Sequence, residues 1–160
     1  MAIKNANYLY EIKKSEGERS AVCKQIFQHF GHTGSLMEFN LYTKLNDEER
    51  KDLCQVIFMV EKDASHILFP LIKDQEISTK DAAVYSIYAM KYVTDHCAKH
   101  DVPAVDYIST TKQSSTAQTF GFNTPSNTQT IGGCDFYEFS KAQTKTEETT
   151  KTKTETPRVQ

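Results

Sequence analysis

Residues 46–60 read Asn-Asp-Glu-Glu-Arg-Lys-Asp-Leu-Cys-Gln-Val-Ile-Phe-Met-Val, a polar start that leads into a strongly apolar stretch. Asn46 is a favourable N-cap residue, and the carboxylates that follow it complement the helix dipole in a first turn. Apolar side chains then recur at the spacing of one helix face: Leu53, Val56, Ile57 and Val60. The segment therefore predicts a helix that continues toward Leu68 and ends or kinks before Pro70.

Two further helices are predicted on either side of this segment. The later one opens at the capping box of residues 78–81 and ends near His100. Its apolar positions are Ala82, Val84, Ile87, Tyr88, Met90 and Val93. The earlier helix begins at Ser20 and is closed by Gly31 and Gly34. Its apolar positions are Val22, Ile26, Phe27 and Phe30.

Strands are predicted only as a minor component. Residues 36–42 alternate between apolar and polar side chains, which is typical of a half-buried strand. Residues 7–13 alternate enough to be a strand, and a first helix fits them nearly as well. The expected fold class is therefore mainly α with a minor β component (α+β), in a mostly helical globular domain over residues 1–110.

The composition changes after residue 110. Residues 111–160 contain 13 Thr, mixed with Ser, Gln and Asn, and show no sustained helix or strand period. Such a segment has too little apolar surface to fold by itself. We therefore expect residues 111–160 to be a flexible, largely extended Thr-rich tail, interrupted by two aromatic segments at 119–123 and 134–140.

The two aromatic segments are candidate docking sites for another protein or another copy of this chain, because exposed rings gain nothing from staying in water. The proposed partner-binding residues are Phe120, Phe122, Asp135, Phe136, Tyr137, Glu138 and Phe139. The alternative is that residues 135–139 fold back as a last strand beside residues 37–41.

A second surface is predicted from Phe58 and Met59, which lie on the far side of the predicted helix from Leu53 and Val60. A helix that is apolar all round is normally buried all round. We therefore predict an oligomer face at Phe58 and Met59, and a homo-oligomer.

Composition limits the classes of function. The formal net charge of −2 gives no overall basic surface for nucleic acid. The 4 Cys show no CxxC spacing, and no apolar leader follows Met1, so reduced thiols and a location in the cytoplasm, or in a virion if the gene is viral, are expected. The longest apolar stretch is too short to span a bilayer.

His96 and His100 lie one turn apart on a predicted helix, which is the spacing that two imidazoles need to share a metal ion. Cys23, His29 and His32 could supply further ligands if the fold brought them near. The simpler interpretation is a solvated helix end whose imidazoles interact with the dipole. We therefore expect no metal and no other cofactor.

A small basic and aromatic patch could contact nucleic acid through Tyr8, Tyr10, Lys13 and Lys14, although glutamates flank it. No Gly-rich phosphate loop or catalytic signature accompanies Cys54 or Cys97. The sequence therefore favours a non-enzymatic interaction, structural or assembly protein. A nucleic-acid-binding accessory protein is the first alternative, and a small metal-binding protein or Cys/His enzyme is the second.

Overall fold

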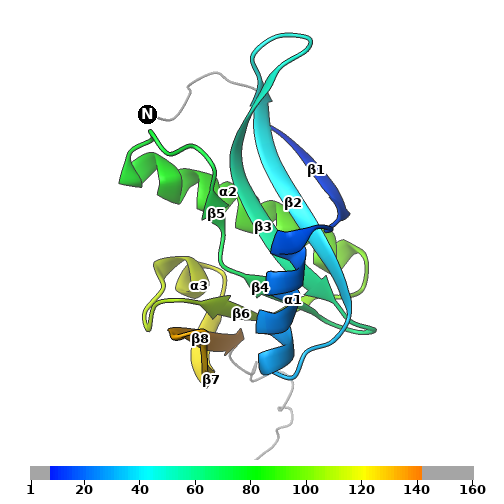
Figure 1. The fold of residues 1–160 in the computed structure, drawn as a ribbon, viewed down its shortest axis with the longest axis vertical. Helices are drawn as coiled ribbons and strands as arrows, with labels where there is room; N and C mark the ends of the chain where they lie inside the picture. The colour runs from blue at the N-terminus through cyan, green and yellow to red at the C-terminus, as the bar shows by residue number, and fades with distance from the viewer. Residues whose placement is uncertain (1–7, 142–160) are drawn as a thin grey trace, which may run out of the picture.

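The computed structural model describes residues 8–141, and in it the chain is organised around one eight-stranded mixed sheet (Figure 1). The elements in chain order are β1 (Leu9–Lys14), α1 (Glu18–His29), β2 (Ser35–Lys44), β3 (Arg50–Val60), β4 (Ser65–Leu68), β5 (Leu71–Ile72), α2 (Thr79–Lys99), β6 (Ala104–Ser109), α3 (Ser115–Thr119), β7 (Phe122–Ile131) and β8 (Cys134–Lys141). The strand order is β1-β2-β3-β4-β6-β8-β7, with β5 paired to β3. All neighbours are antiparallel except β4 and β6, which α2 connects in parallel.

The helix predicted over residues 46–68 is wrong, because this segment forms the turn after β2 and the strands β3 and β4. Val56 and Phe58 are buried on one face of β3, and Ile57 and Met59 are buried on the other. A strand that is covered on both faces reads as a continuous apolar run, so its period does not distinguish it from a helix.

The capping signal at Asn46 is used in a turn instead of a helix. The Asn46 Oδ1 atom accepts hydrogen bonds from the backbone N–H groups of Glu48 and Glu49, at 2.8 and 2.9 Å. This side chain therefore closes the β2–β3 hairpin with the same kind of bond that an N-cap makes.

The prediction of a mainly α fold is also wrong, and "helical domain" does not describe this protein. Helices are present where residues 20–30 and 78–100 predicted them, as α1 and α2. They cover opposite faces of the sheet, whose strands hold more of the described residues than the helices do (Figure 1). The strands that the sequence did not predict are those with both faces buried and those beyond residue 110.

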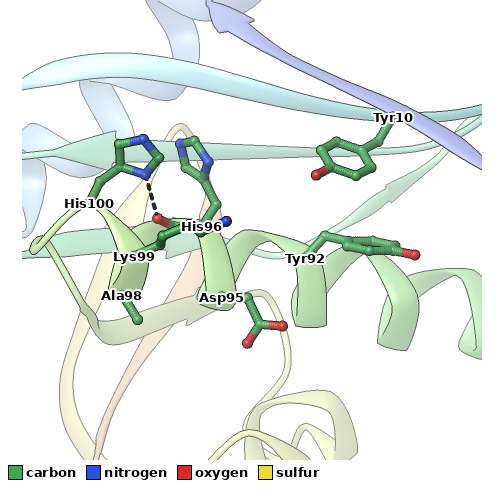
Figure 2. A pocket seen from close by; sticks show the side chains of 7 residues that line it. All are labelled: Tyr10, Tyr92, Asp95, His96, Ala98, Lys99 and His100. Carbon is green, nitrogen blue, oxygen red and sulfur yellow. Dashed lines mark hydrogen bonds between the residues drawn. The ribbon is translucent and has the colours of Figure 1, made fainter.

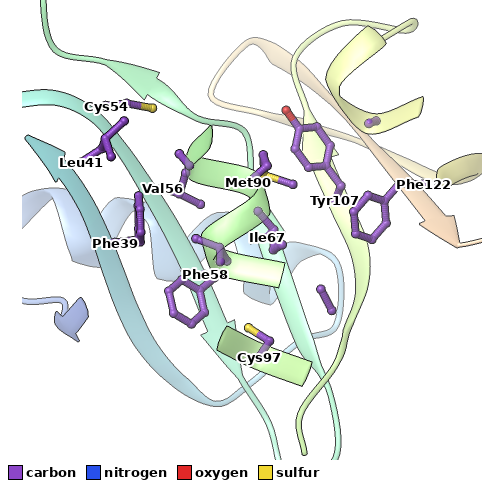
Figure 3. Close-up of a cluster of buried hydrophobic side chains, with 14 of the residues drawn as sticks. Phe39, Leu41, Cys54, Val56, Phe58, Ile67, Met90, Cys97, Tyr107 and Phe122 are labelled. Carbon is purple, nitrogen blue, oxygen red and sulfur yellow. The ribbon is translucent and has the colours of Figure 1, made fainter. Parts of the chain in front are cut away.

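The hydrophobic core has one part on each face of the sheet. On one face, α2 packs on the central strands with Tyr85, Ala89, Met90, Val93 and Cys97 (Figure 3). On the other face, α1 contributes Cys23, Ile26, Phe27 and Phe30. The protein is therefore a three-layer arrangement in which each helix needs the sheet to bury its apolar face.

Residues 111–141 are not an extended tail, so this part of the predicted fold class is wrong. They form α3, β7 and β8, and β8 pairs with β6 on one side and β7 on the other. The 134–140 segment does fold back as a strand, but beside β6 and β7 instead of residues 37–41. β7 is a sheet edge with mostly exposed Thr, Asn and Gln side chains, which explains its polar composition. The rest of the predicted tail lies outside the described residues.

None of the helices within residues 8–141 has both the length and the apolar character that crossing a membrane requires.

Replacing Phe139 tests the placement of β8. Phe139 is 7% exposed and belongs to the core on the α2 face. We expect Phe139→Ala to lower the free energy of unfolding by about 3–5 kcal/mol, because it leaves a cavity at a buried aromatic side chain. Urea denaturation measures this change. Val22→Ala, at a position that is 58% exposed on α1, is the control and should cost far less. Equal small effects of both variants would contradict the buried position of β8.

Candidate metal centre

Three polar side chains lie on neighbouring strands, on the face of the sheet that α1 covers. His66 on β4 is in register with Asp106 on β6. Glu138 on β8 is in register with Ile108, two residues along β6 from Asp106, and so it points to the same face. All three side chains are buried in a part of the sheet that is otherwise apolar.

Two connections bring further groups over these strands. The segment between α1 and β2 carries His32, and the turn between β3 and β4 carries Glu61. The backbone N–H of Thr33 donates to Glu61 Oε2 at 2.9 Å, which joins the two connections. Gly34 permits their close approach, because a Cβ atom there would lie 2.3 Å from the Val60 carbonyl oxygen.

His66 is held by a carboxylate at each ring nitrogen. Its Nδ1 lies 2.6 Å from Asp106 Oδ1, and its Nε2 lies 2.9 Å from Glu61 Oε1. Burial lowers the pKa of His66, but the hydrogen bonds to Asp106 and Glu61 outweigh this effect and the pKa lies above 6.5. The hydrogen bond between His66 and Glu61 also holds the pKa of Glu61 below its usual value. His66 is therefore suited to carry a proton on both nitrogens.

His32 approaches Glu138 and the second oxygen of Asp106. Its Nε2 lies 2.6 Å from Glu138 Oε2 and 3.7 Å from Asp106 Oδ2. Ser126 orients Glu138 by donating to its Oε1 at 3.1 Å. Burial raises the pKa of Asp106, although the hydrogen bond from His66 opposes the rise. This cluster therefore concentrates three carboxylates and two imidazoles in a small, mostly buried space.

Two sets of these residues have ligand atoms within 4.8 Å of one another: His32, Glu61 and His66, and His32, Asp106 and Glu138. The rings of His32 and His66 stack with centroids 3.6 Å apart and planes 8° from parallel. An imidazole lone pair lies in its ring plane, and two stacked rings share no plane. One ion cannot be bound well by both rings in this conformation. The set of His32, Asp106 and Glu138 therefore has the better geometry.

The metal candidates from the sequence are separated in the structure. Only His32 belongs to the groups above. His96 and His100 do lie together on α2, with ring centroids 4.2 Å apart, and His100 Nδ1 bonds to the carbonyl of His96. Cys23 is buried in the core under α1, and His29 bonds to a carbonyl of its own helix. His32 and Cys23 thus do not share a site with His96.

The candidate docking residues lie within the domain. Phe122, Phe136 and Phe139 are buried, while Phe120 and Tyr137 are half-buried and Asp135 is exposed. Glu138 belongs to the cluster with His32. Contact of these residues with a partner stays a prediction.

Phe58 and Met59, the candidate oligomer face, are both fully buried inside the chain. Their positions on opposite faces of β3 account for the apolar pattern within one molecule. Of the nucleic-acid candidates, Tyr8 and Tyr10 lie beside α2, Lys13 lies 3.7 Å from Glu11, and Lys14 is exposed.

Sequence reasoning missed His66, Asp106 and Glu61 as site residues. The available signal was a charged or ionisable residue inside a short apolar run, as in Ser-His-Ile-Leu at 65–68 and Ala-Val-Asp-Tyr-Ile at 104–108. A strand that buries such a residue needs a partner for it.

No protein-family model and no curated protein matches this chain.

The pH dependence of stability tests the state of His66. Its pKa is raised on folding, so its contribution to stability is complete below pH 6.5 and is lost as the pH rises through the folded-state pKa. We expect the difference in unfolding free energy between wild type and His66→Gln to fall from about pH 5.5 to about pH 8.5 in metal-free buffer. Urea denaturation measures it. His29→Gln is the control, and a pH-independent difference for His66→Gln would contradict the proposed ion pairs.

Gly34→Ala tests the close approach that positions His32. The new Cβ would clash with the Val60 carbonyl, so the connection must move. We expect a loss of about 1–3 kcal/mol in stability, measured by urea denaturation. Thr33→Ala, which keeps the backbone bond to Glu61, should leave stability nearly unchanged. A neutral Gly34→Ala variant would show that the two connections are not packed this tightly.

Proposed function

We propose that this protein binds one divalent first-row transition-metal ion through His32, Asp106 and Glu138. The observation that carries the proposal is the convergence of these ligand atoms, within 4.8 Å of one another, from three separate parts of the chain. A metal ion lowers the cost of burying two neighbouring carboxylates, which otherwise repel each other.

His66 would act as a positioning residue for this ion. It holds Asp106 Oδ1, which leaves Asp106 Oδ2 directed toward His32. Ser126 fixes Glu138 in the same way, through Oε1, which leaves Oε2 beside His32. Partners that orient metal ligands in this manner tune metal affinity strongly.

The ligand types indicate the kind of ion. Imidazole suits Zn²⁺ and Fe²⁺, and carboxylates add suitability for Mn²⁺, so a mixed set favours these ions over Mg²⁺ or Ca²⁺. Three protein ligands leave a coordination position for water or a substrate, as in catalytic zinc sites. This proposal favours the metal-binding alternative over the interaction role expected from composition. A homo-oligomer and a location in the cytoplasm or a virion stay predictions.

Metal titration of the metal-free protein tests the proposal. We expect one Zn²⁺ or Mn²⁺ to bind per chain in calorimetry, with much weaker binding of Mg²⁺. His66→Gln should weaken binding about 10- to 100-fold as the loss of an orienting partner, and His32→Ala should weaken it further as the loss of a ligand. His29→Ala, at a helix end outside the cluster, should bind like wild type.

Two results would overturn the proposal. One is the absence of stoichiometric binding by the folded wild type. The other is equal binding by His32→Ala and wild type. His32 lies in a connection between elements, and thermal unfolding of each variant separates lost binding from lost folding.

A further inference from the structure

A second candidate site lies on the other side of the sheet, between β1 and α2. Here a hollow of about 660 Å³ is lined by Tyr10, Tyr92, Asp95, His96, Ala98, Lys99 and His100 (Figure 2). The metal cluster lies on the α1 face and includes none of these residues. The two sites therefore share no residue.

Exposed aromatic rings gather beside this hollow. Tyr88, Tyr92, His96 and His100 follow one another at four-residue spacing, which places them along one side of α2. Tyr10 from β1 stacks on Tyr92 with centroids 4.8 Å apart, and Tyr8 contacts Tyr88 at 5.3 Å. Tyr10, Tyr88 and Tyr92 are 50%, 40% and 37% exposed. Tyr10 also stacks on Phe39, with centroids 5.3 Å apart, and the three tyrosines still keep a third to a half of their surface exposed on one face, which provides a platform for planar groups.

With Lys91 included, the described charged residues around the platform are two lysines and one aspartate, a net charge of +1. Lys99 lines the hollow, and Lys91 lies two turns before it on the same helix. Asp95 is the one acidic lining residue, and Lys91 Nζ lies 3.4 Å from its carboxylate. Burial, together with His100 and Lys99, lowers the pKa of His96, so at neutral pH this ring is an uncharged surface for stacking.

We propose that this face binds a nucleotide, with the base stacked on Tyr10 or Tyr92 and the phosphate beside Lys99. A base supplies the flat ring that the tyrosines can stack against, and a phosphate supplies the negative charge that the lysine complements. The same chemistry occurs in a free nucleotide and in single-stranded nucleic acid. Tyr10, Tyr92 and Tyr88 lie in a row along α2, so successive bases of a single-stranded nucleic acid could stack along it.

Two probes distinguish these sources. Fluorescence anisotropy with a labelled oligo-dT or oligo-rU of about 12 nucleotides measures binding of a strand. Calorimetry with UMP and AMP measures binding of a free nucleotide. Binding of the mononucleotides with no gain for the oligonucleotides identifies a nucleotide site. Tighter binding with length identifies a strand site. Both results support the proposal.

The variants test the two chemical parts separately. Tyr92→Ala should weaken binding about 5- to 150-fold, since it removes one stacking surface, while Tyr92→Phe should bind like wild type. Lys99→Ala should lower the slope of log Kd against log salt by about 0.7 for the oligonucleotide. Val22→Ser and Lys24→Ala on α1 are matched controls on the opposite face and should have no effect.

The proposal is overturned if the folded wild type binds neither probe at about 50 mM salt. It is also overturned if Tyr92→Ala, with an unfolding temperature equal to that of Tyr92→Phe, binds as tightly as wild type. Loss of binding in Val22→Ser would equally contradict it, because that change lies on the α1 face.

Discussion

The structure depends on a sheet whose central strands are covered on both faces. β3 buries Val56 and Phe58 against α2 and Ile57 and Met59 against α1. Both helices bury their apolar side chains against this sheet, and α2 is also the connection that places β4 and β6 side by side in parallel. This pairing brings His66 into register with Asp106, so the arrangement of the core determines where the polar cluster forms.

The cluster is unusual because it puts charge into a layer that is otherwise apolar. Three carboxylates and two imidazoles converge from five separate segments, and each of the buried groups has a partner within 2.9 Å. Burial of that many ionisable groups is costly when hydrophobic residues of similar size would pack as well. On one side of the cluster His32 bonds to Glu138. On the other side a protonated His66 bonds to Asp106 and Glu61, which neutralises part of their charge and orients them. The opposite side of the sheet has a different chemistry, with exposed tyrosines and lysines along α2.

Part of this could be predicted from the sequence. Helices α1 and α2 were predictable, because each has an apolar face and α2 has a true N-cap at Ser78, whose side chain accepts from Asp81 N–H at 3.1 Å. The short helix α3 was not predicted, because it lies in the segment that was expected to be a tail. β2 was predictable from its alternation. β3 was not predictable, because a strand buried on both faces has no alternation of apolar and polar residues. In addition, Asn46 gives the same capping signal in a turn as in a helix. β7 was not predictable either, because an edge strand with exposed Thr and Asn side chains has the same polar composition as an unfolded tail.

By itself, the sequence determined local features: the start of α2 at its N-cap and the alternation of β2. The pairing of distant segments was decided only by the tertiary structure. His32, Asp106 and Glu138 are separated by 74 and 32 residues along the chain, and no local pattern connects them. They meet because two faces of apolar side chains must be covered at once, which fixes the order and register of the strands and hence the neighbours of each polar group.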